Sequence, residues 1–256
     1  MNTKKYYTPI DIARDCGIHT NTVRLYEKSG FVTPAQRDQN HYRMYTELHK
    51  VQFQLCRAIF DYPFTNSKLR GAGCKLLYAS AAGEIEQLRL AYENYVQAIW
   101  MEIDCAKEAV MVAQKWMQGK HSSLQENPAM SRKELAELLG VTTEAIRNWE
   151  RNGLIFSDAV GAKKEKLYSG KQIERTKVVY MLRQAGYSMS ALHKCLFCNA
   201  EGSWQRAIDS LEEADFEEIF SAGDRWMSSL LELWEGTKRI PPLLEQIEKI
   251  SKNNKK

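Results

Sequence analysis

Two stretches of eleven residues decide how this sequence folds: residues 20–30 read TNTVRLYEKSG and residues 143–153 read TEAIRNWERNG. Apolar residues recur three positions apart in both, which predicts a short helix with one buried face. Gly30 and Gly153 end the two helices, because glycine adopts the left-handed turn of a helix end at little cost. The inward-facing residues are Val23 and Tyr26 in the first helix and Ile146 and Trp149 in the second.

The similarity continues on both sides of these helices at one offset of 123 residues. An earlier helix begins in each copy with a helix-start signal, Thr8-x-x-Asp11 or Ser131-x-x-Glu134, whose hydroxyl and carboxylate cap free backbone N–H groups. A glycine ends that earlier helix in both copies. Two short helices joined by a tight glycine turn form a helix-turn-helix, so the chain carries a duplicated one.

A polar, cationic stretch follows each helix-turn-helix, from Thr33 to Tyr45 in the first copy and from Ser157 to Tyr168 in the second. We interpret both as short β-hairpin wings, followed by helices at about 47–60 and 170–185 and then by a short closing helix. The predicted fold class is mainly α: a duplicated winged helix-turn-helix domain, each copy followed by a long helix like that of a coiled coil.

The net charge of +4 is distributed unevenly along the chain. Residues 1–74 hold eleven Lys and Arg against six Asp and Glu, and residues 131–198 hold twelve against seven. The stretches between and after them are acidic: residues 84–118 hold three against six, and residues 201–236 hold two against ten. Two basic segments alternating with acidic ones favour two surfaces that meet a polyanion, although solvation alone is an alternative explanation of the charge.

Several classes of protein are disfavoured by the sequence. No run of eighteen apolar residues is present, and no apolar core follows the lysines of the N-terminus, so neither a membrane span nor a secretory signal is expected. The six cysteines fit reduced cytosolic thiols, and a cytoplasmic location is the expectation. The five histidines are scattered and no glycine loop for phosphate is present, so we expect no enzyme and no catalytic residues.

The run from Thr22 to Gly30, followed by Asn40-His41-Tyr42-Arg43-Met44-Tyr45, resembles the DNA-binding domain of the mercury-resistance regulator (MerR) family. That domain typically carries an Arg-Tyr-Tyr-Glu-like string in its second helix and Asn-Gly-Tyr-Arg-x-Tyr in its wing. The resemblance covers about residues 6–70, with His41 where the family prefers glycine. It covers about residues 131–198 more loosely, with Lys166-Leu167-Tyr168 in place of the wing motif.

The resemblance implies contacts to double-stranded promoter DNA from the second helix and the wing of each copy. Tyr26 and Trp149 are equally well explained as partly core residues. Glu27 and Glu150 indicate structural salt links, because a carboxylate facing phosphate would repel it. Glu144 lowers the expected phosphate affinity of the second copy. The implied DNA-binding residues are Asn21, Thr22, Arg24, Tyr26, Tyr42, Arg43, Arg147, Asn148, Trp149, Lys163, Lys164 and Lys166.

We expect five segments: winged units at 1–74 and 131–198, a long helix at 75–119, a linker at 120–130, and a second helical segment with a basic tail at 199–256. The second long helix is expected to break near Ala214-Asp215 or Ala222-Gly223-Asp224. Long helices of the resembled family pair antiparallel in dimers. The two long helices can therefore pair within one chain, as a pseudo-dimer, or between two chains of a homodimer.

Regulators of this family respond to metals, oxidants or organic compounds, so an effector is an open expectation; no cofactor is predicted. Cys195 and Cys198 have the spacing of a metal or redox pair, but no second pair or histidine lies at ligand spacing, and we expect no metal site. Aromatic residues beside carboxylates can hold an apolar cation, although such residues are more often core. The candidates are Tyr92, Tyr95, Trp100, Trp204 and Trp226.

The sequence therefore predicts a sequence-specific DNA-binding transcription regulator. The resemblance implies that it distorts a promoter with an overlong spacer for RNA polymerase, at a cost in DNA deformation energy that is offset by contacts. One alternative is an architectural or recombination-directing protein, since excisionases use a similar winged unit; the long helices count against it. Another is a regulator whose second copy binds protein, because Glu144 and the missing wing arginine weaken that copy as a DNA reader.

Overall fold

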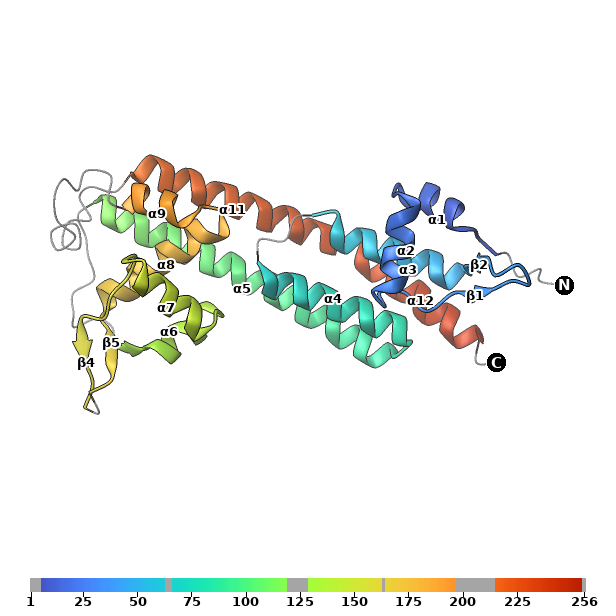
Figure 1. Cartoon of the computed structure of the whole chain (residues 1–256), viewed down its shortest axis with the longest axis horizontal. Coiled ribbons are helices and arrows are strands. Elements are labelled where there is room, and N and C mark those ends of the chain that lie inside the picture. Colours follow the sequence, from blue (N-terminus) through green and yellow to red (C-terminus); the bar gives the residue numbers. More distant parts are fainter. Residues whose placement is uncertain (1–5, 63–65, 119–128, 163, 197–214, 255–256) are drawn as a thin grey trace. The chain divides into compact units, whose positions relative to one another are not determined.

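The computed structural model describes residues 6–62, 66–118, 129–162, 164–196 and 215–254. The chain forms two compact units, and each unit draws on both halves of the sequence (Figure 1). Unit 1 consists of Met1–Trp100 together with Leu231–Lys256, and unit 2 consists of Met101–Leu230. Within the described residues, no helix is both long enough and apolar enough to cross a membrane.

The helix-turn-helix of unit 1 comprises α1 (Pro9–Cys16) and α2 (Thr20–Lys28). Thr8 and Asp11 form the expected capping box at the start of α1, and Pro9 occupies the first turn, where its missing N–H is not needed. Gly17 closes α1 with φ of 62°. A residue with a Cβ would be strained in that left-handed conformation, which explains why both copies carry glycine at this turn.

The wing of unit 1 is a two-stranded hairpin of β1 (Gln36–Arg37) and β2 (Arg43–Met44), in which Gln36 pairs with Met44 and Arg37 with Arg43. Tyr7 adds an antiparallel bridge to Tyr45. His41, at the wing turn, has φ of 62°. The left-handed backbone at this position explains why glycine is preferred there in the family that the sequence resembles.

Among the described residues, five further helices contribute to unit 1. They are α3 (Glu47–Phe60), α4 (Ser67–Ala82), the first part of α5 (Ile85–Met117), the end of α11 (Phe216–Thr237) and α12 (Ile240–Asn254). The core of the winged domain gathers on α3, where Phe53, Leu55 and Ile59 are fully buried. The C-terminal helix α12 packs along α3. The first part of α5 also meets the C-terminal segment, through Arg89 Nη2 and Glu248 Oε2 at 2.5 Å.

The second copy repeats these elements at the same offset: β3 (Met130–Ser131), α6 (Arg132–Leu139), α7 (Thr143–Arg151), β4 (Ala159–Val160), β5 (Lys166–Tyr168), α8 (Gly170–Gln184) and α9 (Met189–Leu196). Its strands form a sheet in the order β3-β5-β4, in which the pairing of Met130 with Tyr168 reproduces the bridge of the first copy. Lys164 has φ of 61°, as His41 does in the first wing. The expected duplication is thus present down to single backbone angles.

Unit 2 is completed by the second part of α5 and the first part of α11, and both pack on α8. The Trp116 indole donates to Glu174 Oε2 at 3.2 Å, and the Tyr180 hydroxyl donates to Glu102 at 2.8 and 3.0 Å. The Trp226 ring lies edge-on to Tyr180, with centroids 5.6 Å apart. A first-half helix therefore closes the second winged unit.

The break that we expected at residues 222–224 does not occur, because α11 runs without interruption from Phe216 to Thr237. A Cβ on Gly223 would lie 2.8 Å from a methyl carbon of Val110 on α5. Gly223 therefore permits close helix packing and does not end the helix. At the other expected position, Asp215 directly precedes α11, and its carboxylate accepts from the N–H of Glu218 at 3.0 Å; the residues before Asp215 lie outside the described residues.

Candidate nucleic-acid interface

Helix α2 presents a polar, cationic face to solvent. Asn21, Arg24 and Lys28 are exposed, whereas Val23 is fully buried. Leu25 lies on the exposed face with 56% of its surface accessible. Thr22 is half-buried. Within the described residues neither Arg24 nor Lys28 lies in an ion pair, so both cations of this face are available to an anion.

Tyr26 belongs to an aromatic cluster beneath α2 rather than to the exposed face. Its ring lies 6.0 Å from that of Phe31 and 5.5 Å from that of Phe60, centroid to centroid, and burial raises the pKa of its hydroxyl. Trp149, its counterpart in α7, is only 5% exposed. Both side chains pack in the interior of their units, which favours the alternative that they are partly core residues, and their contact with DNA stays a prediction.

Glu27 joins α2 to the wing. Its carboxylate accepts from Arg43 Nε at 2.5 Å, from the Tyr45 hydroxyl at 3.0 Å and from the backbone N–H of Ala35 at 3.3 Å. The structural salt link predicted for Glu27 is confirmed. Arg43 is correspondingly half-buried and held by that carboxylate. Arg43 therefore fixes the wing against α2. The sequence predicted only a DNA contact for this residue, and not this structural contact.

The tip of the wing in unit 1 is exposed and ordered by local hydrogen bonds. Tyr42 has 71% of its surface exposed, as expected for a DNA-contacting residue. The carboxylate of Asp38 accepts from the N–H groups of Asn40 and Tyr42, at 2.9 and 2.8 Å. Arg37 donates to the carbonyl of His41 at 2.9 Å. Arg37 and Tyr42 therefore project from a preorganised turn.

The recognition helix of unit 2, α7, has a different electrostatic surface. Glu144 binds Arg147 at 3.1 Å, and it also binds Arg151. The hydrogen bond from Arg147 lowers the pKa of the Glu144 carboxyl most, and the charge of Arg151 lowers it further. The carboxylate is therefore ionised. The Asn148 side-chain oxygen accepts from Asn152 Nδ2 at 3.3 Å. The second copy thus has the predicted cations, but a carboxylate partly neutralises them.

The wing of unit 2 is held by the structural salt link predicted for Glu150, through cations that the sequence pattern did not identify. Glu150 accepts from Arg132 Nη2 at 2.6 Å and lies 3.6 Å from Lys166 Nζ, and these cations lower its pKa against the opposing effect of burial. Lys166 occupies the position of Arg43, and Arg132 that of Pro9, in the first copy. The offset of 123 residues could have revealed this exchange of cations. Lys164 is exposed, and Lys163 lies outside the described residues.

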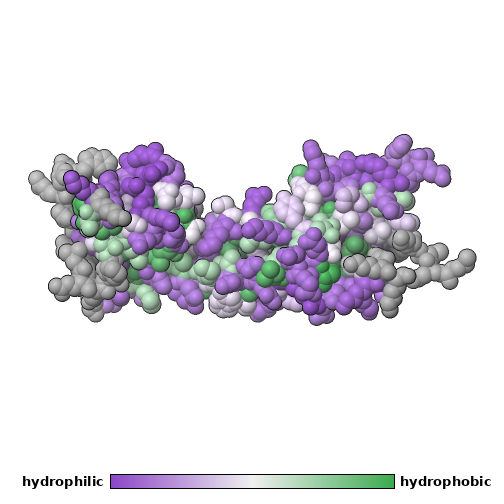
Figure 2. Space-filling model, turned by 90° about the horizontal axis from the view of Figure 1, so that it is seen from below, coloured by the Kyte–Doolittle hydropathy of each residue, from purple (hydrophilic) through white to green (hydrophobic). Residues whose placement is uncertain are grey.

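Hydrophilic residues cover most of the winged parts of both units in the view of Figure 2. Two family models match the chain in these parts: "MerR family regulatory protein" at residues 8–45 and "MerR HTH family regulatory protein" at residues 130–196. Each unit therefore contains one stretch that matches a MerR-family model. The tandem arrangement is thereby confirmed, and the match to regulatory proteins agrees with the expectation that the chain is not an enzyme.

The curated relatives of this chain include HTH-type transcriptional regulator CueR of Escherichia coli O157:H7, 40% identical over 47 residues, which is 18% of this chain and 35% of the relative. CueR of Yersinia pestis is 35% identical over 60 residues, 23% of this chain and 43% of the relative. The chain therefore spans well under half the length of the curated relatives that it matches. No solved structure matches it.

Among the described residues, three of the candidate effector residues belong to unit 1 and one belongs to unit 2. Tyr95 is fully buried in unit 1, where Trp100 stacks at a tilt on Trp234 with centroids 4.6 Å apart. Trp226 is buried in unit 2. Tyr92 is half-buried, and burial raises the pKa of its hydroxyl. Trp204 and Cys198 lie outside the described residues, as does the side chain of Cys195.

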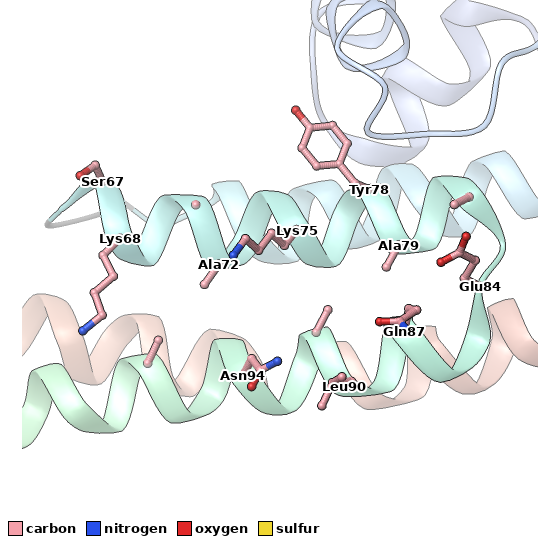
Figure 3. Close-up of a pocket in the computed structure, with 14 residues that line it drawn as sticks. Ser67, Lys68, Ala72, Lys75, Tyr78, Ala79, Glu84, Gln87, Leu90 and Asn94 are labelled. Carbon is pink, nitrogen blue, oxygen red and sulfur yellow. The ribbon is translucent and has the colours of Figure 1, made fainter. Parts of the chain in front are cut away.

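A groove between α4 and α5 was not predicted. It has a volume of about 820 Å³, and its lining includes Lys68, Lys75, Tyr78 and Asn94 (Figure 3). Most other lining residues are alanine or small polar residues, which give no signal in a sequence. Across the described residues, no group of three or more His, Cys, Asp or Glu side chains is placed to hold a metal ion.

Proposed function

We propose that the chain is a DNA-binding transcription regulator in which α2 and the adjoining wing of unit 1 make the stronger contacts to DNA. The observation that carries this proposal is the exposed cationic face of α2, where Arg24 and Lys28 have no ion-pair partner among the described residues. The winged domain is rigidly built around it, because Glu27 ties the wing to the helix. Cations on a rigid helix neutralise phosphates and position the helix in the groove.

Fluorescence anisotropy across a salt series tests this proposal, with labelled duplex from the promoter region of the gene itself. Each phosphate contact contributes about 0.9 to the slope of log K against log salt. Arg24→Ala is expected to weaken binding and flatten the slope by about one contact. Lys249→Ala, which removes an exposed cation of α12, is the matched control and should leave the slope unchanged. No binding by the wild-type chain would refute the proposal.

Arg147→Ala, measured in the same way, separates the two functions considered for the second copy. We expect a smaller effect than for Arg24→Ala, because Glu144 already neutralises part of the charge of Arg147. No effect at all would favour a second copy that binds protein. The exposed Val160 on its wing, with 72% of its surface accessible, would then be a contact to that partner.

We further propose that one chain acts as a pseudo-dimer. In unit 1, α12 packs on α3, and Trp234 of α11 packs on Trp100 of α5. In unit 2, Glu102 of α5 binds Tyr180 of α8. Each winged unit is thus completed by the long helix of the other half, as the two halves of a homodimer would complete each other.

Mass photometry of the chain on its duplex tests the pseudo-dimer. One chain per duplex is the expected stoichiometry. Two chains per duplex would support the homodimer that the sequence left as the alternative. A half-chain ending in the linker supplies the control: it lacks α12, so unit 1 should lose its protection from proteolysis until the second half is added.

Distortion of promoter DNA is proposed on the same grounds, since two readers joined by helices can impose a bend or twist on the DNA between them. RNA polymerase is the implied partner. Transcription in vitro from promoters with a series of spacer lengths tests this step. Activation confined to overlong spacers is expected, whereas equal activation at every length would refute distortion.

An effector response is proposed for the buried acid-aromatic cluster of unit 2, in which Tyr180 joins Glu102 to Trp226. Glu102 and Trp226 are each 1% exposed, and the Trp226 indole nitrogen has no hydrogen-bond partner among the described residues. A carboxylate beside aromatic rings suits an organic cation. Tetraphenylphosphonium, used as the probe, should raise the melting temperature of the wild type but not of Trp226→Phe. Equal shifts would refute this site.

A further inference from the structure

The two recognition helices present equivalent positions to solvent, because both copies fold with one offset. Four pairs of positions lie on the exposed faces of α2 and α7. Two pairs keep a cation in both helices, and two pairs differ in chemistry. The pairs are Arg24 with Arg147, Lys28 with Arg151, Asn21 with Glu144, and Leu25 with Asn148.

The shared cations indicate that both helices meet the same part of a duplex. Arginine and lysine at these positions suit phosphate oxygens, which set the position of a protein on DNA without reading its sequence. The difference between the copies therefore falls on the other two pairs. Those positions are occupied by side chains that can reach base edges from the same face.

The differing pairs favour different bases. An asparagine such as Asn21 forms two hydrogen bonds with adenine, whereas a carboxylate such as that of Glu144 accepts from the amino group of cytosine. Leu25, 56% exposed, offers an apolar contact of the kind that suits a thymine methyl group. Asn148, at the equivalent position, has a side-chain amide suited to adenine. No base is preferred in common by either pair.

The geometry of Glu144 supports a reading function. Arg147 and Arg151 hold its carboxylate at the exposed first turn of α7, where its side chain remains 59% exposed. A carboxylate has about four acceptor sites, so two arginines do not exhaust it. The arginines also offset the repulsion that an isolated carboxylate would meet beside phosphates.

We infer that the chain binds a DNA site with two unlike half-sites, and that Glu144 and Asn148 determine the bases of the second. This inference rests on the proposed DNA-binding function and adds the base specificity of the two recognition helices, α2 and α7. The two wings also carry different side chains at equivalent positions: Arg37 and Tyr42 of the first wing correspond to Val160 and Glu165 of the second. A homodimer of identical readers would instead select a symmetric site.

Selection from a pool of randomised duplexes tests the inference with the full chain. The wild type is expected to enrich two half-sites with different preferred bases. A double variant, Glu144→Asn with Asn148→Leu, gives α7 the side chains of α2 and should convert the second half-site toward the first. For one chosen base, we expect the preference to change by about 5- to 150-fold, the range of a good bidentate contact.

Each outcome has a separate meaning. Enrichment of nothing refutes the proposed DNA-binding function itself. Enrichment of two matching half-sites, of only one half-site, or of a motif that the double variant leaves unchanged overturns the inference while DNA binding stands. Circular dichroism of the variant shows whether it folds. Arg24→Ala, which removes a cation that lies in no ion pair among the described residues, is the control for phosphate contact and should weaken binding to all enriched sequences equally.

Discussion

Replacing Glu27 with alanine should loosen the winged domain of unit 1 more than any exposed substitution. The Glu27 carboxylate accepts from Arg43, Tyr45 and the N–H of Ala35, and its side chain is only 13% exposed. Alanine leaves three donors without an acceptor, and the Tyr45 hydroxyl cannot recover water because the residue is fully buried. A second variant, Glu27→Gln, keeps the length and shape of the side chain and removes its charge.

The magnitude follows from the three bonds. A hydrogen bond to a charged group contributes about 1.5 to 3 kcal/mol, and we take the lower end for Arg43 because its side chain is 29% exposed. The other two contribute about 1 kcal/mol each, so Glu27→Ala should cost about 3.5 kcal/mol. That corresponds to a loss of roughly 400-fold in local protection from exchange. Glu27→Gln keeps one acceptor oxygen and replaces the other by an amide group that cannot accept from the Ala35 N–H, so it should cost roughly 1.5 kcal/mol.

Hydrogen exchange followed by mass spectrometry measures these values in the peptides of α2 and the wing. Protection there should fall in the order wild type, Glu27→Gln, Glu27→Ala. Glu86→Ala, an exposed glutamate of the same unit, is the control and should leave protection unchanged. A change of less than about threefold for Glu27→Ala would refute the view that this carboxylate joins the wing to the recognition helix.

Three further predictions follow from buried groups. Burial lowers the pKa of His49 in the folded chain, so on acidification the histidine of the unfolded chain binds a proton first, and the free energy of unfolding decreases as the pH falls below about 6.5. His49→Gln keeps an acceptor for the Thr46 N–H and should abolish this loss of stability in urea titrations. Burial raises the pKa of the Cys16 thiol to about 11, so its alkylation at pH 8 should be about 100-fold slower than in the unfolded chain. Tyr180→Phe removes the donor to Glu102 and should cost about 2 kcal/mol in unit 2.

Each of these predictions has a contradicting result. A urea midpoint that falls equally with pH in wild type and His49→Gln would exclude that histidine as the cause. Rapid labelling of the Cys16 peptide at pH 8 would show that its thiol is not shielded. Unchanged exchange in the peptides of α8 after Tyr180→Phe would show that Glu102 does not depend on that hydroxyl. Tyr92→Phe, on the same helix as Glu102, is the matched control.

Local sequence signals were sufficient to predict the elements of both winged helix-turn-helix units. Capping boxes, helix-ending glycines and apolar spacing act over a few residues, so their consequences are visible in the order of the residues. Gly17 and its counterpart Gly140 both have φ of 62°, as a local turn requires. The single offset also revealed the duplication, and the carboxylates of Glu27 and Glu150 were recognised as structural because phosphate would repel them.

Long-range packing determines which of the chemically suitable side chains are available. Arg24 and Arg147 are equivalent in sequence, yet among the described residues only Arg147 lies in an ion pair with a carboxylate, and Tyr26 packs into an aromatic cluster. The completion of each winged unit by helices from the other half also lay beyond sequence reasoning. Such packing joins residues more than a hundred positions apart, as Trp100 and Trp234 are, and the complementarity of two distant surfaces leaves no local pattern in either.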